Sequence, residues 1–211
     1  MAPFLVLGTP RSRTAWLAKF LSYGGRTCLH EPSRHMGGLD DLLRLLDRPG
    51  VAISDSGLTL RWRDIVMHRP DALIVVVRRP VDDVVRSFAA MQERIGLWPS
   101  TEGVPDHHRI HMERDKAQYT DEVRRATIRV AEAADDLMEN TPAMHVAYSA
   151  LGYAPVQMGI FQYCHGIELP LSQWQKWNGV RVLAPERQHM QDAWNNREGL
   201  RRLFPELSES A

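Results

Sequence analysis

A short polar segment near the start of the chain has the residues needed to bind an anion. It runs from Gly8 to Thr14, reads GTPRSRT, and follows the apolar run Phe4 to Leu7. That run predicts a buried strand, and the residues up to Leu21 predict a helix with its large apolar side chains on one face. Free N–H groups and the positive end of a helix bind phosphate-like anions at such a junction. An ordinary turn with a Ser or Thr cap is the alternative that this segment leaves open.

The segment departs from the loop that binds the phosphates of ATP. That loop reads G-x-x-x-x-G-K-[ST], and its lysine reaches the outer phosphates. In this chain Arg13 stands where the second glycine would be, and the lysine is absent. We therefore expect the segment to hold an anion other than the magnesium-bound tail of ATP.

The rest of the chain alternates between predicted strands and predicted helices. Ala72 to Val77 is the clearest strand, because six apolar residues in a row belong in the middle of a parallel sheet covered on both faces. Alternation without a repeat or a linker indicates one α/β domain with a mostly parallel sheet. The other strands are expected at Thr27–His30, Val51–Ser54 and Met144–Tyr148, and the other helices at Leu39–Leu46, Val81–Ile95, Asp121–Asn140 and Pro155–His165.

The segment after the first strand resembles the P-[KR]-S-G-T-T-W-L loop of sulfotransferases, in the style of the carbohydrate and bacterial members of that family. The resemblance implies a P-loop NTPase-like three-layer sandwich, in which helices flank a mostly parallel central sheet. It implies 3′-phosphoadenosine 5′-phosphosulfate as the donor, with no metal, and a loop that binds the 5′-phosphosulfate end of that donor. Arg13 replaces the glycine of the family loop, Ala15 replaces a threonine, and the matching residues are Pro10, Arg11, Ser12, Thr14, Trp16 and Leu17.

A second segment resembles the part of the family that holds the 3′-phosphate of the donor. The family has a strand that ends in an arginine, followed by a helix that carries a serine. Here the strand ends in Arg78-Arg79, and Ser87 follows Arg79 by eight residues. Either Arg79 pairs with Ser87, or Arg78 lies opposite Arg86, and the spacing leaves both open. Further along, the strand that leads to Tyr148 resembles the strand-tyrosine-leucine segment near the C-terminal end of the family.

Sulfuryl transfer requires a base for the acceptor hydroxyl, in-line geometry and positive charge at the departing phosphate. Arg11, at the start of the predicted helix, is the candidate for that charge. Glu31 follows the strand that ends at His30, at the carboxyl edge where open α/β sheets bind ligands. A Glu-Pro at this place resembles the carboxylate-bearing segment of the carbohydrate sulfotransferases, so we expect Glu31 to be the base. His30 is the second choice, since it titrates near neutrality, and a capping or ion-pairing role for Glu31 stays open.

Other polar residues are better explained by structure than by chemistry. Asp55 and Ser56 follow a strand at the same edge and could contact the acceptor, although turn formation explains them more simply. The spacing of His107, His108 and His111 allows a metal site, but the flanks predict a solvated loop, and a role at the acceptor site is a further option. Trp174 and Trp177 could stack on a base or sugar, although packing is the commoner role of such aromatic residues.

The composition argues against several classes of partner. Lys plus Arg equals Asp plus Glu at 26 each, which gives no basic field for nucleic acid. Cys28 and Cys164 lie far apart, so a metal cluster or disulfide framework is not expected, and a reducing compartment is. No apolar run reaches the ~18 residues of a membrane span, and the start does not resemble a secretory signal. We expect a cytoplasmic protein without a membrane partner, and the sequence leaves its oligomeric state open, with a homodimer among the options.

The sequence supports one principal reading and two alternatives. The chain is interpreted as a single domain over residues 1–211, with a helical or irregular acceptor-side insertion at about 96–140 and a helical segment near its end. The principal reading is a sulfotransferase acting on a hydroxyl or amine of a small molecule or sugar. The alternatives are a P-loop kinase of nucleotides or small molecules and a non-catalytic nucleotide-binding module, which Arg13 in place of glycine keeps open.

Overall fold

The structure is a computed structural model that describes residues 2–34, 36, 38–95, 116–178 and 180. Residues up to Val180 form one compact unit. Its strands are β1 (Phe4–Gly8), β2 (Thr27–His30), β3 (Val51–Ser54), β4 (Leu73–Arg78) and β5 (Ala143–Ala147). Its helices are α1 (Thr14–Leu21), α2 (Leu39–Leu46), α3 (Trp62–His68), α4 (Val81–Ile95), α5 (Lys116–Asn140), α6 (Ala154–His165) and α7 (Leu171–Trp177).

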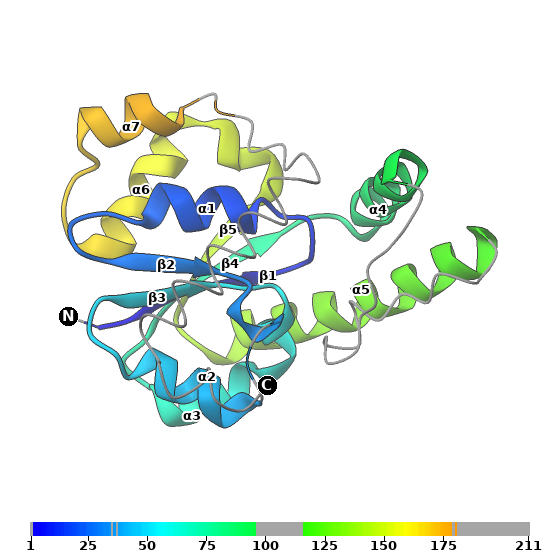
Figure 1. The fold of residues 1–211 in the computed structure, drawn as a ribbon, viewed down its shortest axis with the longest axis horizontal. Coiled ribbons are helices and arrows are strands. Elements are labelled where there is room, and N and C mark those ends of the chain that lie inside the picture. The colour runs from blue at the N-terminus through cyan, green and yellow to red at the C-terminus, as the bar shows by residue number, and fades with distance from the viewer. Residues whose placement is uncertain (1, 35, 37, 96–115, 179, 181–211) are drawn as a thin grey trace. The chain divides into compact units, whose positions relative to one another are not determined.

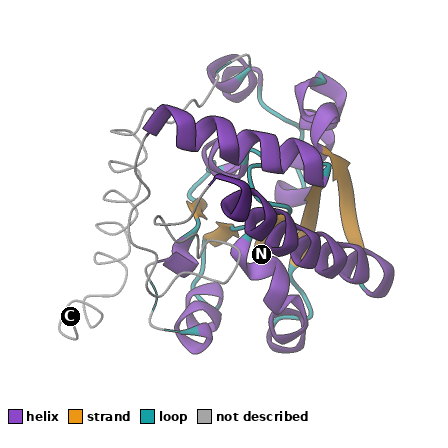
Figure 2. Cartoon of the chain, turned by 90° about the vertical axis from the view of Figure 1, so that its right-hand side faces the viewer, coloured by secondary structure: helices purple, strands orange, loops and turns teal. Residues whose placement is uncertain are grey.

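The five strands form one parallel sheet in the order β2-β3-β1-β4-β5. In Figure 1, α1 and α6 lie on one face of the sheet, and α2, α3 and α5 lie on the other. Figure 2 shows the strands between helices on either side. The expected α/β sandwich is therefore confirmed, and its sheet is parallel throughout.

The central strands are apolar on both faces because helices cover both faces. Phe4 to Leu7 in β1 and Val75 to Val77 in β4 are fully buried. Burial of an apolar side chain of this size contributes ~1.5–3 kcal/mol relative to exposure. These two neighbouring strands anchor the middle of the sheet, and the residues that follow them are held in fixed positions.

The carboxyl ends of all five strands meet at one edge of the sheet, because every strand runs in the same direction. The residues after them, in strand order along the chain, are the loop from Thr9, then Glu31, Asp55, Arg79 and Tyr148. Most of the residues singled out from the sequence therefore lie at this edge. This is where parallel sheets of α/β proteins bind their ligands.

Several boundaries differ from the sequence expectation. β4 begins at Leu73 and ends at Arg78, and α5 begins at Lys116, five residues before the predicted start. The short helices α3 and α7 were not predicted. Within the predicted insertion, residues 116–140 form α5, which packs along α4 and against the sheet. Residues 96–115 and the predicted helical segment of the tail lie outside the described residues, and the single-domain interpretation of residues 1–211 stays a prediction.

No helix among the described residues is long and apolar enough to cross a membrane. The described residues also include no group of three or more His, Cys, Asp or Glu side chains that could hold a metal ion. The three histidines His107, His108 and His111 lie outside them, so their role stays open.

Candidate functional site

The loop after β1 is held in shape by buried hydroxyl groups. The Oγ1 atom of Thr9 lies 2.9 Å from Oγ of Ser12 and accepts a hydrogen bond from the backbone N–H of Arg79 over 2.8 Å. The N–H of Gly8 donates to Oγ1 of Thr59 over 2.8 Å, and that hydroxyl donates back to the Gly8 carbonyl over 3.0 Å. Thr9, Ser12 and Thr59 are fully buried. The loop is therefore tied from within to the turn after β3 and to the end of β4.

Gly8 is required at the start of this loop. Its φ is +132°, and a Cβ at this position would lie 2.0 Å from the backbone oxygen of Val77. Such a contact is far inside van der Waals distance, so any side chain would push β1 away from β4. The close approach of these two strands fixes where the loop begins.

Three candidate site residues have a backbone conformation that L-residues rarely adopt. Arg11 has φ 59°, Arg13 has φ 62° and Glu31 has φ 46°, and no other non-glycine residue in the described part of the chain has a positive φ. A non-glycine residue in this region costs of order 1–3 kcal/mol and persists where the surroundings hold it. The strain is thus concentrated at the loop after β1 and at the end of β2.

Arg11 connects the two motifs that were singled out from the sequence. Its Nε atom donates a hydrogen bond to Oγ of Ser87 on α4 over 3.2 Å. Its carbonyl oxygen accepts a hydrogen bond from NH1 of Arg79 over 2.7 Å. The guanidinium of Arg11 also lies 5.9 Å from the ring centroid of Phe88. The structure therefore brings Arg11, Arg79 and Ser87 together at the mouth of the loop.

Arg78 and Arg79 are directed to different partners. NH2 of Arg78 lies 2.7 Å from Oδ2 of Asp135 on α5, where it forms an ion pair. Arg79 instead contacts Arg11, and its guanidinium lies 4.3 Å from the ring centroid of Tyr148. Nε of Arg79 is buried without a hydrogen-bond partner. Consecutive residues at the end of a strand point to opposite faces, which is why the two arginines have different partners.

His30 and Glu31 lie on the other side of the loop, at the end of β2. Nε2 of His30 is 3.2 Å from Oγ1 of Thr14 and 3.8 Å from Oε1 of Glu31. Ser54 at the end of β3 donates from Oγ to the carbonyl of Thr14 over 2.9 Å. Glu31 is largely buried, at 8% exposure. These contacts place the candidate base close to the first turn of α1.

Asp55 is a fully buried carboxylate that joins two turns. Its Oδ1 accepts from the N–H of Gly57 over 2.8 Å, and its Oδ2 accepts from the N–H of Ser33 over 3.1 Å. Burial and then the neighbouring charge of Glu31 raise the pKa of Asp55 to about 6. The turn-forming role expected from the sequence agrees with these bonds. The sequence did not indicate that Asp55 and Glu31 would lie close enough to interact.

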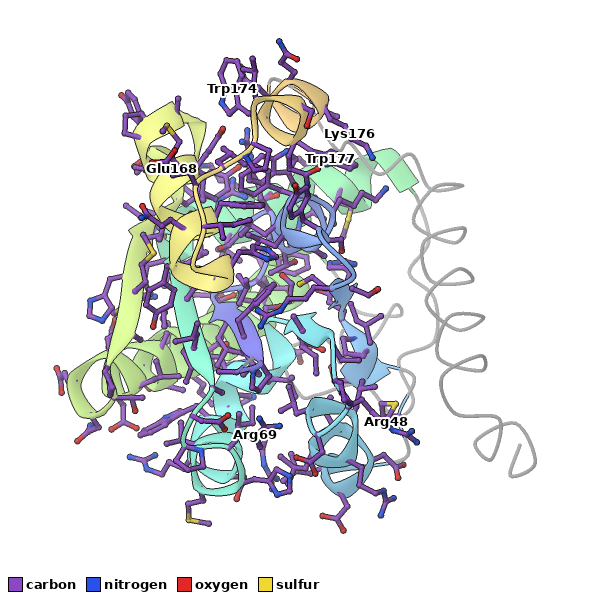
Figure 3. The ribbon with its side chains drawn as sticks, turned by 90° about the vertical axis from the view of Figure 1, so that its left-hand side faces the viewer. Arg48, Arg69, Glu168, Trp174, Lys176 and Trp177 are labelled. Atoms are coloured by element: carbon purple, nitrogen blue, oxygen red, sulfur yellow. The ribbon has the colours of Figure 1, made fainter. Side chains whose placement is uncertain are left out.

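The remaining residues of the loop motif are buried or half-buried, and Trp16 packs beneath the loop. Trp16 is 4% exposed and stacks on Phe20, with 4.7 Å between ring centroids. Its Nε1 donates to the carbonyl of Trp177 over 3.2 Å, and Figure 3 labels both Trp177 and Trp174 on α7. Pro10 is buried and Ala15 is half-buried. A role in donor binding stays a prediction for these residues and for the buried hydroxyl of Ser12.

Two residues that contact the candidate site, Thr59 and Tyr148, were not named as site residues in the sequence analysis, although Tyr148 was noted there in a segment that resembles the family. No periodic pattern or motif in the sequence marks Thr59, and only the fold shows that its hydroxyl bonds to the loop. Tyr148 follows β5, and its position after a strand was a usable signal for a residue at the carboxyl edge. Its ring lies near the guanidinium groups of both Arg13 and Arg79.

The solved structures to which this chain is similar include two sulfotransferases. The first is a sulfotransferase domain from the curacin biosynthetic pathway, with a TM-score of 0.53 and 12% identity, covering 85% of this chain and 79% of that one. The second is a sulfotransferase from Alicyclobacillus acidocaldarius, with a TM-score of 0.49 and 15% identity, covering 83% of this chain and 89% of that one. No protein-family model and no curated protein matches the chain. The first likeness confirms the sulfotransferase-like α/β fold expected from the sequence, and at this identity it shows the fold alone.

Proposed function

We propose that this chain is a sulfotransferase that moves a sulfuryl group from 3′-phosphoadenosine 5′-phosphosulfate to a hydroxyl or amine of a small molecule or sugar. The observation that carries the proposal is the hydrogen bond from Arg11 to Ser87, with Arg79 bonded to the Arg11 carbonyl. Two motifs that are 76 residues apart in the chain meet there. The result is one anion site at the start of α1 and a second cationic group beside it, which suits a donor with two separate phosphate-bearing ends.

The residues at this edge fit the charge of the donor. The N-terminal turn of α1 and Arg11 would hold the 5′-phosphosulfate, because a helix N-terminus and a guanidinium both favour anions. Arg79 and Ser87 would hold the 3′-phosphate. The buried Nε of Arg79 has no partner among the described residues, and a phosphate oxygen would satisfy this donor.

Glu31 would act as the base of the proposed reaction. Its carboxylate would take the proton of the acceptor hydroxyl, and the acceptor oxygen would form a bond to sulfur. The bond from sulfur to the 5′-phosphate oxygen would break, and its electron pair would stay on that phosphate. Arg11 and the N–H groups of α1 would stabilise the charge that develops there. His30, which lies between Thr14 and Glu31, links the base to the loop.

The proposal is tested by following the sulfur of the donor. The protein is incubated with 3′-phosphoadenosine 5′-[³⁵S]phosphosulfate and pooled alcohols, amines and sugars, and labelled products are separated from the donor. We expect label on at least one acceptor, with release of adenosine 3′,5′-bisphosphate in equal amount. Arg11→Ala should lose both donor affinity and turnover. Tight donor binding without transfer to any acceptor would instead favour a non-catalytic binding module.

A further inference from the structure

Arg13 is the residue that most distinguishes this loop from the sulfotransferase pattern. It is the N-cap residue of α1, with φ 62° and ψ 28°. Glycine adopts this left-handed conformation at little cost, whereas arginine does so with strain. The side chain of Arg13 is exposed, and its guanidinium lies 5.9 Å from the ring centroid of Tyr148. An arginine in this place therefore projects positive charge toward the end of β5.

Arg13 and Arg79 approach the same aromatic ring from two different loops. The guanidinium of Arg79 is 4.3 Å from the Tyr148 centroid, and that of Arg13 is 5.9 Å from it. The negative face of an aromatic ring attracts a cation within about 6 Å. Two like charges beside one ring also repel each other, and an anion bound between them would remove that repulsion.

Neither of these guanidinium groups forms an ion pair with a carboxylate within the part of the chain that the structure describes. Other arginines near this edge do, as Arg78 with Asp135 and Arg124 with Asp82 show. The buried Nε of Arg79 has no hydrogen-bond partner. Arg13 and Arg79 thus have donor capacity that the described protein atoms do not use.

We propose that Arg13 and Arg79, on either side of the site and joined through Tyr148, form a clamp for the 3′-phosphate of the donor. Arg13 would then set the preference for a nucleotide that is phosphorylated at the 3′ position. This inference rests on the proposed function. It gives the arginine a binding role at a position where the sulfotransferase pattern has only a glycine backbone.

The test compares two nucleotides that differ only in the 3′-phosphate. Adenosine 3′,5′-bisphosphate and adenosine 5′-monophosphate are titrated calorimetrically into the wild type and into Arg13→Gly. We expect the wild type to prefer the bisphosphate, and the variant to lose about tenfold of that preference, as removal of a charge-assisted hydrogen bond predicts. Affinity for the monophosphate should change little. Because glycine suits this φ, the melting temperature of the unliganded variant should equal or exceed that of the wild type.

Further variants test whether the Tyr148 ring and the position of the Arg13 charge account for the nucleotide preference. Tyr148→Phe keeps the ring and should retain the wild-type preference, whereas Tyr148→Leu should reduce it. Arg48→Gly is the matched control for charge, because Arg48 precedes β3 at the opposite edge of the sheet. In Figure 3, Arg48 lies on the other side of the sheet from α7. This control should leave the preference unchanged.

Three results would overturn the inference, and they can be told apart. An unchanged preference in Arg13→Gly removes Arg13 from the clamp but leaves the proposed function standing. Equal loss of affinity for both nucleotides places Arg13 at the 5′ end of the ligand instead. A wild type without any preference for the bisphosphate removes the proposed function together with the clamp.

Discussion

The Nε atom of Arg11 lies 3.2 Å from Oγ of Ser87 and donates a hydrogen bond to it. This bond joins the loop after β1 to α4, and Arg79 closes the same connection by donating to the Arg11 carbonyl over 2.7 Å. An anion at the loop would compete for the Arg11 guanidinium, whereas an anion beside α4 would use Ser87 and Arg79. On the proposed function, these three residues would serve two neighbouring positions for negative charge.

Alanine at Ser87 or at Arg79 should weaken discrimination between adenosine 3′,5′-bisphosphate and adenosine 5′-monophosphate. A hydrogen bond to a charged group contributes ~1.5–3 kcal/mol, so loss of Arg79 should reduce the preference by about tenfold or more. Ser87→Ala should have a smaller effect in the same direction. The measurement is the ratio of the two dissociation constants from calorimetry.

Arg78→Ala is the matched comparison for this prediction. It removes the same charge from the neighbouring position but breaks an ion pair with Asp135, so the nucleotide preference should persist. A reduced preference in Arg78→Ala alone, with Arg79→Ala unchanged, would exchange the assignments of the two arginines.

Glu31→Gln should bind the donor almost as the wild type does and lower turnover by ~10²–10⁴, the usual contribution of general-base catalysis. Glutamine keeps the shape of the side chain but cannot accept the proton of the acceptor. The check is steady-state turnover together with donor affinity, with donor hydrolysis as the readout until an acceptor is identified.

His30→Asn tests the second candidate for the base. If it abolishes turnover while Glu31→Gln stays active, His30 is the base and Glu31 is a structural group at the end of β2.

Asp55 should make the folded protein less stable as the pH rises from about 4 to about 6. Burial and the charge of Glu31 raise the pKa of Asp55 from 3.8 to about 6 in the folded state. The folded state then binds more protons than the unfolded state over this interval, so the free energy of unfolding falls with rising pH. The loss is complete above pH 6 and absent below pH 4.

This prediction is checked by urea unfolding of the wild type and of Asp55→Asn between pH 4 and pH 7. Asparagine does not titrate, so the stability of the wild type relative to this variant should decrease as the pH rises. Asp71→Asn serves as a control of opposite sign, because hydrogen bonding to Arg69 lowers the pKa of Asp71. A relative stability that is constant with pH would contradict the buried, coupled state of Asp55.

The elements that positioned these residues were predicted where a periodic apolar pattern defined them. α1, β2, α2, β3 and α4 have the bounds expected from the sequence. The short helix α3 was missed, because seven residues carry little periodic signal. α5 extends further toward its N-terminus than predicted, since the polar residues from Lys116 contribute no apolar stripe.

The sequence predicted which candidate residues lie at this edge of the sheet, but not which of them contact one another. Arg11 and Glu31 follow the carboxyl ends of strands, and Ser87 was indicated by the resemblance to the sulfotransferase segment of a strand-end arginine and a helical serine. The partner of each arginine depends on the direction in which the end of β4 points and on the position of α5. Neither of these can be predicted from the local sequence. For this reason the spacing left Arg78 and Arg79 as alternatives, and only the structure shows that Arg78 pairs with Asp135.

Gly8→Ala should destabilise the protein by at least ~3 kcal/mol, because overpacking and an unsuitable backbone conformation act together. The new Cβ would lie 2.0 Å from the backbone oxygen of Val77, and β1 could not keep its place beside β4. Gly24→Ala is the control, since Gly24 also has a positive φ, +60°, but nothing within 4 Å of the added Cβ. It should cost only ~1 kcal/mol. Equal losses in the two variants, measured by urea unfolding, would contradict the close approach of Val77.

The central claim is that the loop after β1 holds a phosphosulfate donor and not the magnesium-bound tail of ATP. The most direct test is the melting temperature of the wild type with adenosine 3′,5′-bisphosphate and, separately, with ATP and Mg²⁺. A ligand that binds only the folded state at 100 times its dissociation constant adds ~2.7 kcal/mol of stability, which a melting scan resolves. We predict a clear upward shift with the bisphosphate and a much smaller shift with ATP and Mg²⁺. A larger shift with ATP and Mg²⁺ would contradict the donor assignment and favour a kinase.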